Sequence, residues 1–160
     1  MKPVTIRTVL SLSLTHHWPI RQLDVNNAFL HGVLYEEVYM EQPPGFRNSS
    51  HPTHVCRLHK AIYGLKQAPR AWFQKFSGFH LHYGFVCSRA DPRMFVFHSS
   101  IGIMILLIYV DDIIITGSSS SLLHSFICVL SQQFAMKDLG KLHYFLGIEA
   151  KRTFTELHLC

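Results

Sequence analysis

The sequence predicts an α+β fold, in which an antiparallel sheet is packed against helices. Three segments carry apolar residues at helical spacing, and several short apolar or alternating runs between turn residues have the pattern of strands. Two of those runs flank a tight turn, which favours antiparallel pairing. The chain has 160 residues, 48% of them hydrophobic, which is enough for a real core, so a single domain is expected over residues 1–160.

The first part of the chain predicts one helix and three strands. Apolar residues over 6–14 recur at helical spacing, and a Trp-Pro pair ends that helix. A short strand is expected over 21–25, followed by a turn or short helix over 26–32. Two more strands are expected, over 37–41 and over 54–62.

Two further helices are expected later in the chain. The first covers 67–83, begins near a proline and stops at Gly84. The second covers 122–134, and one of the three serines at 119–121 caps it. Short strands are expected over 136–159.

The most apolar part of the chain predicts a central hairpin. A strand is expected over 94–97, and the uniformly apolar run 103–110 has the pattern of a central strand covered on both faces. The run 113–116 is its hairpin partner, so the adjacent carboxylates Asp111 and Asp112 fall at the turn. We expect both carboxylates to be exposed there and held rigidly.

Three aspartates at strand ends are candidates for a metal site. Asp24 lies beside Asp111 and Asp112 if its strand is adjacent to the hairpin in the sheet. Three converging carboxylates would suit Mg²⁺, which prefers carboxylate, water and phosphate oxygens. Two such ions support phosphoryl transfer by activating a hydroxyl and stabilising the leaving group. The alternative is that Asp111 and Asp112 form only a polar turn.

The charge distribution indicates a polyanion as a partner. The formal net charge is +5, and no Asp or Glu occurs between Gln42 and Ala90. Seven basic residues fall in that stretch: Arg47, Arg57, Lys60, Lys66, Arg70, Lys75 and Arg89. A solvated basic face is the alternative interpretation.

The remaining composition argues against several classes of protein. The four cysteines form no C-x-x-C pair, so neither a disulfide framework nor a zinc knuckle is predicted. The twelve histidines form no metal-binding motif and are interpreted as surface or core residues. The longest apolar run is well short of the roughly 20 residues that span a bilayer. No signal peptide is recognised at the start, so an intracellular protein with reduced thiols is expected.

Five segments of the chain occur in the order found in one enzyme family. They are 22–32 (QLDVNNAFLHG), 38–46 (VYMEQPPGF), 63–73 (YGLKQAPRAWF), 109–112 (YVDD) and 136–148 (MKDLGKLHYFLGI). On these segments the chain resembles the reverse transcriptase of copia-type LTR retrotransposons, part of the Pol polyprotein. The resemblance implies a polymerase palm with part of the fingers, and with the thumb absent.

The resemblance assigns roles in catalysis to the three aspartates. Asp24 would be the first metal-binding carboxylate, and the Val25 carbonyl would be a further ligand. Asp111 would bridge two Mg²⁺ ions, for which Mn²⁺ can substitute, and Asp112 would support the site.

The resemblance also implies a deoxynucleoside triphosphate site. Phe29 matches an aromatic residue that blocks a ribose 2′-hydroxyl, although core packing explains it equally well. Tyr63 and Gly64 match the floor of the nucleotide pocket. Lys66 lies nearby in the sequence, four residues before Arg70. The two either share a helix face toward phosphate or are simply solvated.

The implied partners are an RNA or DNA template with its primer, and deoxynucleoside triphosphates, with no membrane. The implied template and primer contacts are Arg70, Tyr109, Val110, Phe145, Leu146 and Gly147. The implied location is the cytoplasm, or a virus-like particle in an intact element. Two alternatives stay open: a catalytically silent remnant that at most binds nucleic acid, and another palm-type enzyme such as a nucleotide cyclase, against which the segment 63–73 argues.

Overall fold

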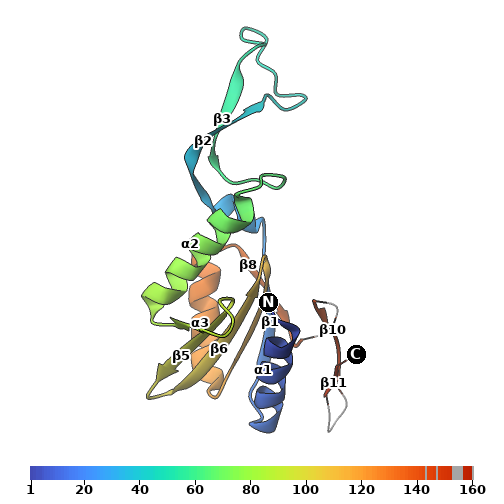
Figure 1. The fold of residues 1–160 in the computed structure, drawn as a ribbon, viewed down its shortest axis with the longest axis vertical. Helices are drawn as coiled ribbons and strands as arrows, with labels where there is room; N and C mark the ends of the chain where they lie inside the picture. The colour runs from blue at the N-terminus through green and yellow to red at the C-terminus, as the bar shows by residue number, and fades with distance from the viewer. Residues whose placement is uncertain (143, 147, 153–156, 160) are drawn as a thin grey trace. The chain divides into compact units, whose positions relative to one another are not determined.

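The computed structural model describes residues 1–142, 144–146, 148–152 and 157–159. The chain divides into two compact units, the first formed by Met1–Asn27 and Gly78–Cys160 and the second by Ala28–Ser77 (Figure 1). The predicted α+β class, with an antiparallel sheet and packed helices, is confirmed. The single domain over 1–160 and its assignment to palm and fingers stay predictions.

The first unit is built on a six-stranded sheet with the strand order β4-β5-β6-β7-β1-β8. Its elements are α1 (Pro3–Thr15), β1 (Ile20–Val25), β4 (Val86–Cys87), β5 (Met94–Ser99), β6 (Gly102–Tyr109), β7 (Asp112–Gly117), α3 (Ser120–Gln133) and β8 (Met136–Gly140). A smaller sheet holds β9 (Tyr144–Phe145), β10 (Ile148–Arg152) and β11 (Leu157–Leu159). All pairings among the described strands are antiparallel.

The β6–β7 hairpin forms the middle of the sheet, as its uniformly apolar sequence predicts. Residues 104–108 and 113–116 are all buried, so side chains on both faces are covered. Leu107 pairs with Ile114, and Leu106 with Ile115, so each face receives matched apolar side chains. Packing on both faces of the sheet therefore holds the two strands of the hairpin up to the turn.

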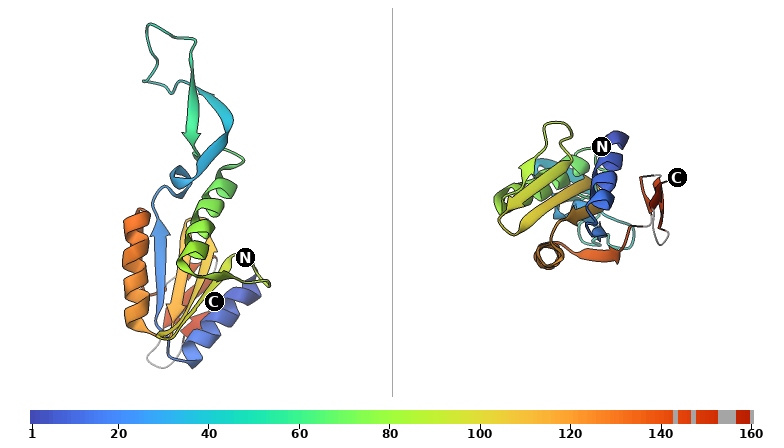
Figure 2. Two further views of the ribbon diagram at one scale, coloured as in Figure 1. Left: turned by 90° about the vertical axis from the view of Figure 1, so that its left-hand side faces the viewer. Right: turned by 90° about the horizontal axis from the view of Figure 1, so that it is seen from below.

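Helices cover the two faces of this sheet, with α1 and α3 on opposite sides (Figure 2). On one face, Ile6, Val9 and Leu10 of α1 pack in a cluster with Ile105, Leu107, Ile114, Leu142 and Phe145. On the other face, Phe126 of α3 is fully buried and contacts Phe85, with ring centroids 4.9 Å apart. Burying one such side chain contributes about 1.5–3 kcal/mol.

Helix α3 begins at a serine cap. Ser119 has extended backbone angles, and its side-chain oxygen accepts a hydrogen bond from the Leu122 N–H. This satisfies one of the N–H groups that a helix leaves unpaired at its start. Of the three serines at 119–121 that the sequence predicts as possible caps, Ser119 is therefore the one that caps the helix.

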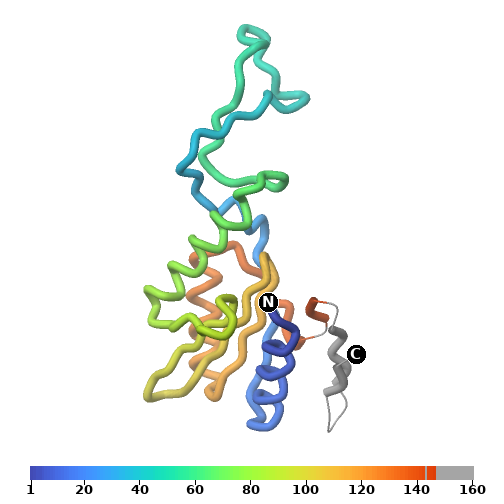
Figure 3. Tube along the Cα trace, in the orientation of Figure 1, coloured from blue at the N-terminus to red at the C-terminus, as the bar shows by residue number. Residues whose placement is uncertain are grey.

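The second unit contains a 3-10 turn η1 (Ala28–His31), a hairpin of β2 (Val33–Glu41) and β3 (Val55–Lys60), and the start of α2 (Ala68–Tyr83). Figure 3 traces the chain through these elements. Strand β2 begins four residues before the predicted start at residue 37. Gly32 is needed before β2 because a Cβ there would lie 2.9 Å from the Trp72 backbone nitrogen. Helix α2 continues into the first unit and ends at Tyr83, and the next residue, Gly84, has φ +111°.

The carboxylate of Asp91, which is buried, caps helix α1 from a distant part of the chain. It accepts hydrogen bonds from the Lys2 N–H at 2.9 Å and the Arg93 N–H at 3.1 Å. Burial by itself raises the pKa of the Asp91 carboxyl, but these bonds and one from the Thr5 hydroxyl outweigh it, so the pKa lies below its ordinary value of 3.8.

Among the described residues no helix is long and apolar enough to cross a bilayer.

We expect Asp91→Asn to lower the free energy of unfolding at pH 7 by about 1–3 kcal/mol, because the charged acceptor of two part-buried hydrogen bonds is lost. The pKa of the folded state lies below that of the unfolded chain. The stabilisation is therefore complete above pH 3.8 and disappears as the pH falls through the folded value.

Urea unfolding at pH 7 and at pH 3 measures both effects. Glu36→Gln, which removes an exposed carboxylate, is the control and should change stability by less than about 0.5 kcal/mol. An Asp91→Asn chain as stable as the control at pH 7 would contradict the assignment.

Candidate functional site

The register of strand β1 brings the three candidate aspartates to one end of the sheet. Asp24 pairs directly with Asp112 across β1 and β7, and Tyr109 pairs with Asp112 across the hairpin. The Val25 N–H donates to the Asp111 carbonyl at 3.0 Å, which continues the β1–β7 ladder to the turn. Residues opposite each other in such pairs have Cβ atoms about 4.5–5.5 Å apart. Asp24, Asp111 and Asp112 are therefore close neighbours.

The expectation that the hairpin carboxylates are exposed is wrong. Asp24, Asp111 and Asp112 are all half-buried, and Asp112 is the first residue of β7 rather than part of the turn. Burial raises the pKa of the Asp112 carboxyl, and the nearby Asp111 and Asp24 carboxylates raise it further. The three acids thus repel one another in a partly desolvated setting, which favours a bound cation.

Gln22 supports this site, a role that the sequence analysis missed. Its side chain is buried, and its amide donates both to the Asp112 carboxylate and to the Tyr144 carbonyl, the latter at 3.0 Å. The hydrogen bond to Asp112 opposes the rise in pKa. Gln22 therefore links Asp112 to strand β9.

The turn that presents Asp111 is strained. Val110 has φ +56°, a left-handed conformation that β-branched residues rarely adopt. Such a residue costs on the order of 1–3 kcal/mol and persists only where the surrounding structure holds it. Here the paired strands on either side impose the two-residue turn, which fixes the main chain at Asp111.

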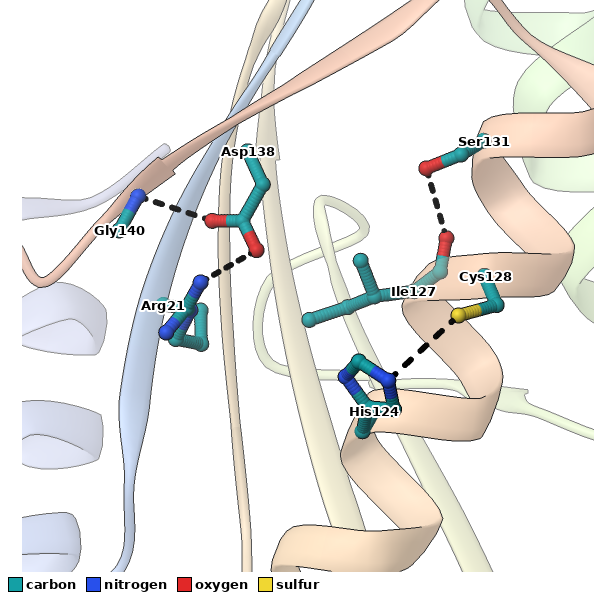
Figure 4. Close-up of polar contacts among 7 residues, drawn as sticks. All are labelled: Arg21, His124, Ile127, Cys128, Ser131, Asp138 and Gly140. Carbon is teal, nitrogen blue, oxygen red and sulfur yellow. Dashed lines mark hydrogen bonds and ion pairs between the residues drawn. The ribbon is translucent and has the colours of Figure 1, made fainter.

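Lys137 is a second residue that the sequence analysis did not single out. It pairs with Asp24 across β1 and β8, on the side of Asp24 away from Asp112, and its side chain is exposed. On the opposite face of β1, Arg21 binds the Asp138 carboxylate, which also accepts from the Gly140 N–H (Figure 4). This ion pair holds β8 against β1 and so keeps Lys137 beside the carboxylates.

The oxygen-rich group suits a hard divalent cation such as Mg²⁺ by donor chemistry. Asp24, Asp111 and Asp112 offer carboxylate oxygens, and the main-chain carbonyl of Val25 adds another at the end of β1. Within the part of the chain that the structure describes, no three His, Cys, Asp or Glu side chains are already arranged as a metal-binding group. The backbone thus brings the ligands together, while the carboxylates still have to turn toward an ion.

The predicted template and primer residues of the first unit occupy different environments. Tyr109 is 37% exposed, and the Arg93 guanidinium lies 5.5 Å from the centre of its ring. Phe145, by contrast, is 2% exposed and belongs to the core cluster under α1, with Leu146 packed against it. The Phe145 ring therefore packs in the core, and the role of this segment beside the primer terminus stays a prediction. Gly147 lies outside the described residues.

In the second unit, Phe29 and Tyr63 form an aromatic pair. Their ring centroids are 4.4 Å apart, with Phe29 buried and Tyr63 57% exposed. Gly64 follows in the left-handed region with φ +90°, where a side chain would be strained. A buried aromatic ring beside an exposed one is compatible with both interpretations of Phe29, the core residue and the sugar-contacting residue.

The expected shared helix face of Lys66 and Arg70 is wrong. Helix α2 begins at Ala68, with Pro69 in its first turn, so Lys66 lies in the preceding turn. Arg70 lines a pocket of about 200 Å³ between α2 and β2. The polar side chains in its wall include Glu36, Gln67, Arg70 and Gln74. Arg70 and Lys66 are both exposed.

Comparison with known proteins identifies the family. Residues 2–160 match the family described as reverse transcriptase (RNA-dependent DNA polymerase). The retrovirus-related Pol polyproteins from transposons RE1 and RE2 of Arabidopsis thaliana are each 54% identical over 159 residues, which are 99% of this chain and 11% of the relative. The corresponding polyprotein from transposon TNT 1-94 of Nicotiana tabacum is 43% identical over 160 residues, 99% of this chain and 12% of the relative.

The chain therefore belongs to the reverse transcriptase family, and the resemblance to the copia type is confirmed. It spans only 11–12% of the length of these Pol polyproteins.

Gln22→Met should lower the free energy of unfolding by about 1–3 kcal/mol, because the Tyr144 carbonyl, in a part-buried hydrogen bond, and the half-buried Asp112 carboxylate each lose a donor. Equilibrium urea unfolding measures the change. Gln132→Met, at an exposed position of α3, is the matched control and should have little effect. Equal stability of the two variants would show that Gln22 does not support Asp112.

Proposed function

We propose that this chain carries the catalytic carboxylates of an RNA-directed DNA polymerase, which joins deoxynucleotides to a primer at a two-metal site. The observation that carries the proposal is the direct pairing of Asp24 with Asp112, with Asp111 one residue away at the strained turn. The family supports the same reaction class. A polar turn with no further role would not require a third acid on the neighbouring strand.

The residues of the site have distinct tasks in this proposal. Asp24, Asp111 and the Val25 carbonyl would hold two Mg²⁺ ions, with Mn²⁺ as a substitute, and Asp112 would support them. When bound, such ions activate the primer hydroxyl and stabilise the leaving pyrophosphate. Lys137, beside Asp24 and exposed, is positioned to attract phosphate oxygens of the substrate.

The second unit would supply contacts with substrates. Its six basic residues are all exposed, against three acidic residues, which favours a polyanion. Arg57 is paired with Glu37 at 3.1 Å, whereas Lys66 and Arg70 flank the start of α2. In this proposal Tyr63, Gly64 and Lys66 face the deoxynucleotide, and Arg70 faces the template or primer.

The test replaces the matching segment of the RE1 Pol polyprotein with this chain and measures primer extension on an RNA template. Asp111→Asn should lower the extension rate by at least about a thousandfold, because the carboxylate acts on charge that develops in the transition state. Folding should be preserved, because Asp111 is half-buried at a turn.

The matched control is Glu41→Gln, which removes an exposed acid of the second unit and should leave extension unchanged. Circular dichroism checks that each variant is folded. Comparable extension by folded Asp111→Asn and by the unmodified chimera would overturn the carboxylate assignment.

In the same chimera, Phe29→Val should raise ribonucleotide incorporation relative to deoxynucleotide incorporation by about tenfold. Removing the ring opens space for a 2′-hydroxyl if Phe29 contacts the sugar. The ratio of the two incorporation rates is independent of how much enzyme is folded. Phe46→Val, at an 82% exposed ring of the same unit, is the control. An unchanged ratio would leave Phe29 as a core residue.

A further inference from the structure

The outer face of helix α3 brings a thiol and an imidazole together. His124 and Cys128 are one helical turn apart, and both are exposed. The Cys128 Sγ lies 3.8 Å from the His124 Nε2, and Figure 4 shows the two donor atoms facing each other. The sequence analysis interpreted the histidines as surface or core residues, and neither side chain takes part in the carboxylate site.

The distance between these atoms matches that of a chelating pair. A Zn²⁺ ion bonds sulfur at about 2.3 Å and imidazole nitrogen at about 2.0–2.1 Å, and a tetrahedral angle then places the two donors about 3.5 Å apart. The observed 3.8 Å differs from this by only about 0.3 Å. Little movement of either side chain is needed to bind an ion.

The surroundings leave the pair accessible to a cation. Helix α3 contains no Asp, Glu, Lys or Arg between Ser120 and Gln133, so no charged side chain of the helix competes for either donor. The neighbouring Ser131 hydroxyl already donates to the Ile127 carbonyl at 2.9 Å, as Figure 4 shows. On the buried side of the helix, Leu123, Phe126 and Leu130 pack in the core, which fixes the spacing of the two ligands on the outer face.

We propose that His124 and Cys128 form a bidentate site for a thiophilic divalent cation such as Zn²⁺, separate from the oxygen-rich Mg²⁺ site. Thiolate and imidazole ligands select Zn²⁺ over Mg²⁺, whereas carboxylates and phosphates favour Mg²⁺. Two ligands four residues apart on one helix face are an established way of holding zinc. Water completes the coordination, and the bound ion stabilises α3 by linking two successive turns of the helix.

The test uses the 160-residue chain with excess Mg²⁺ present, so that the carboxylates are occupied. Titration with Co²⁺ should produce a thiolate-to-metal absorption band at one ion per chain. Zn²⁺ should displace Co²⁺ and raise Tm by about 5 °C at a hundredfold excess over its Kd, because it binds the folded helix. Neither response should appear with Mg²⁺ alone.

Variants distinguish the chelate from other sites. Both responses should be lost in Cys128→Ser and in His124→Gln, and retained in Cys56→Ser and His98→Gln, which alter another thiol and another exposed imidazole. Absence of the band in the unmodified chain, or its persistence in Cys128→Ser, overturns the proposal. A band that survives in His124→Gln also overturns it, because binding would then rest on the thiol alone.

Discussion

The site depends on one constraint. Three carboxylates that repel one another are held together by the pairing of β1 with β7. Asp24 and Asp112 are opposite each other in an antiparallel ladder, and Asp111 adds a third charge beside them. Such a cluster is unfavourable without a cation. The apolar pairing of the β6–β7 hairpin, buried on both faces, supplies the stability that keeps the charges in place.

The rest of the first unit holds this arrangement from several directions. Helix α1 packs against one face of the sheet and is capped by Asp91, while α3 packs against the other. Gln22 connects Asp112 to β9, and the Arg21–Asp138 pair fastens β8 at the edge. The strain at Val110 persists because these contacts determine both strands of the turn.

Much of the fold could be predicted from periodicity, because long apolar patterns identify elements whatever their partners. The central hairpin and helices α1, α2 and α3 followed from such patterns. The partners of single side chains could not be predicted, because they depend on pairings between residues about 90–120 positions apart. Gln22, Lys137 and the Asp91 cap are examples. The resemblance predicted a primer contact for Phe145, but the burial of its ring in the core under α1 depends on tertiary packing that the sequence does not show.

The most direct measurement of the central claim is paramagnetic broadening of amide resonances by Mn²⁺ in the isotopically labelled chain. Because Mn²⁺ suits the same oxygen ligands as Mg²⁺, the account predicts that residues 24–25 and 110–112 broaden first and that excess Mg²⁺ reverses the effect. Broadening centred elsewhere, or none at these residues while the chain is folded, would contradict the claim that the three aspartates form one cation site.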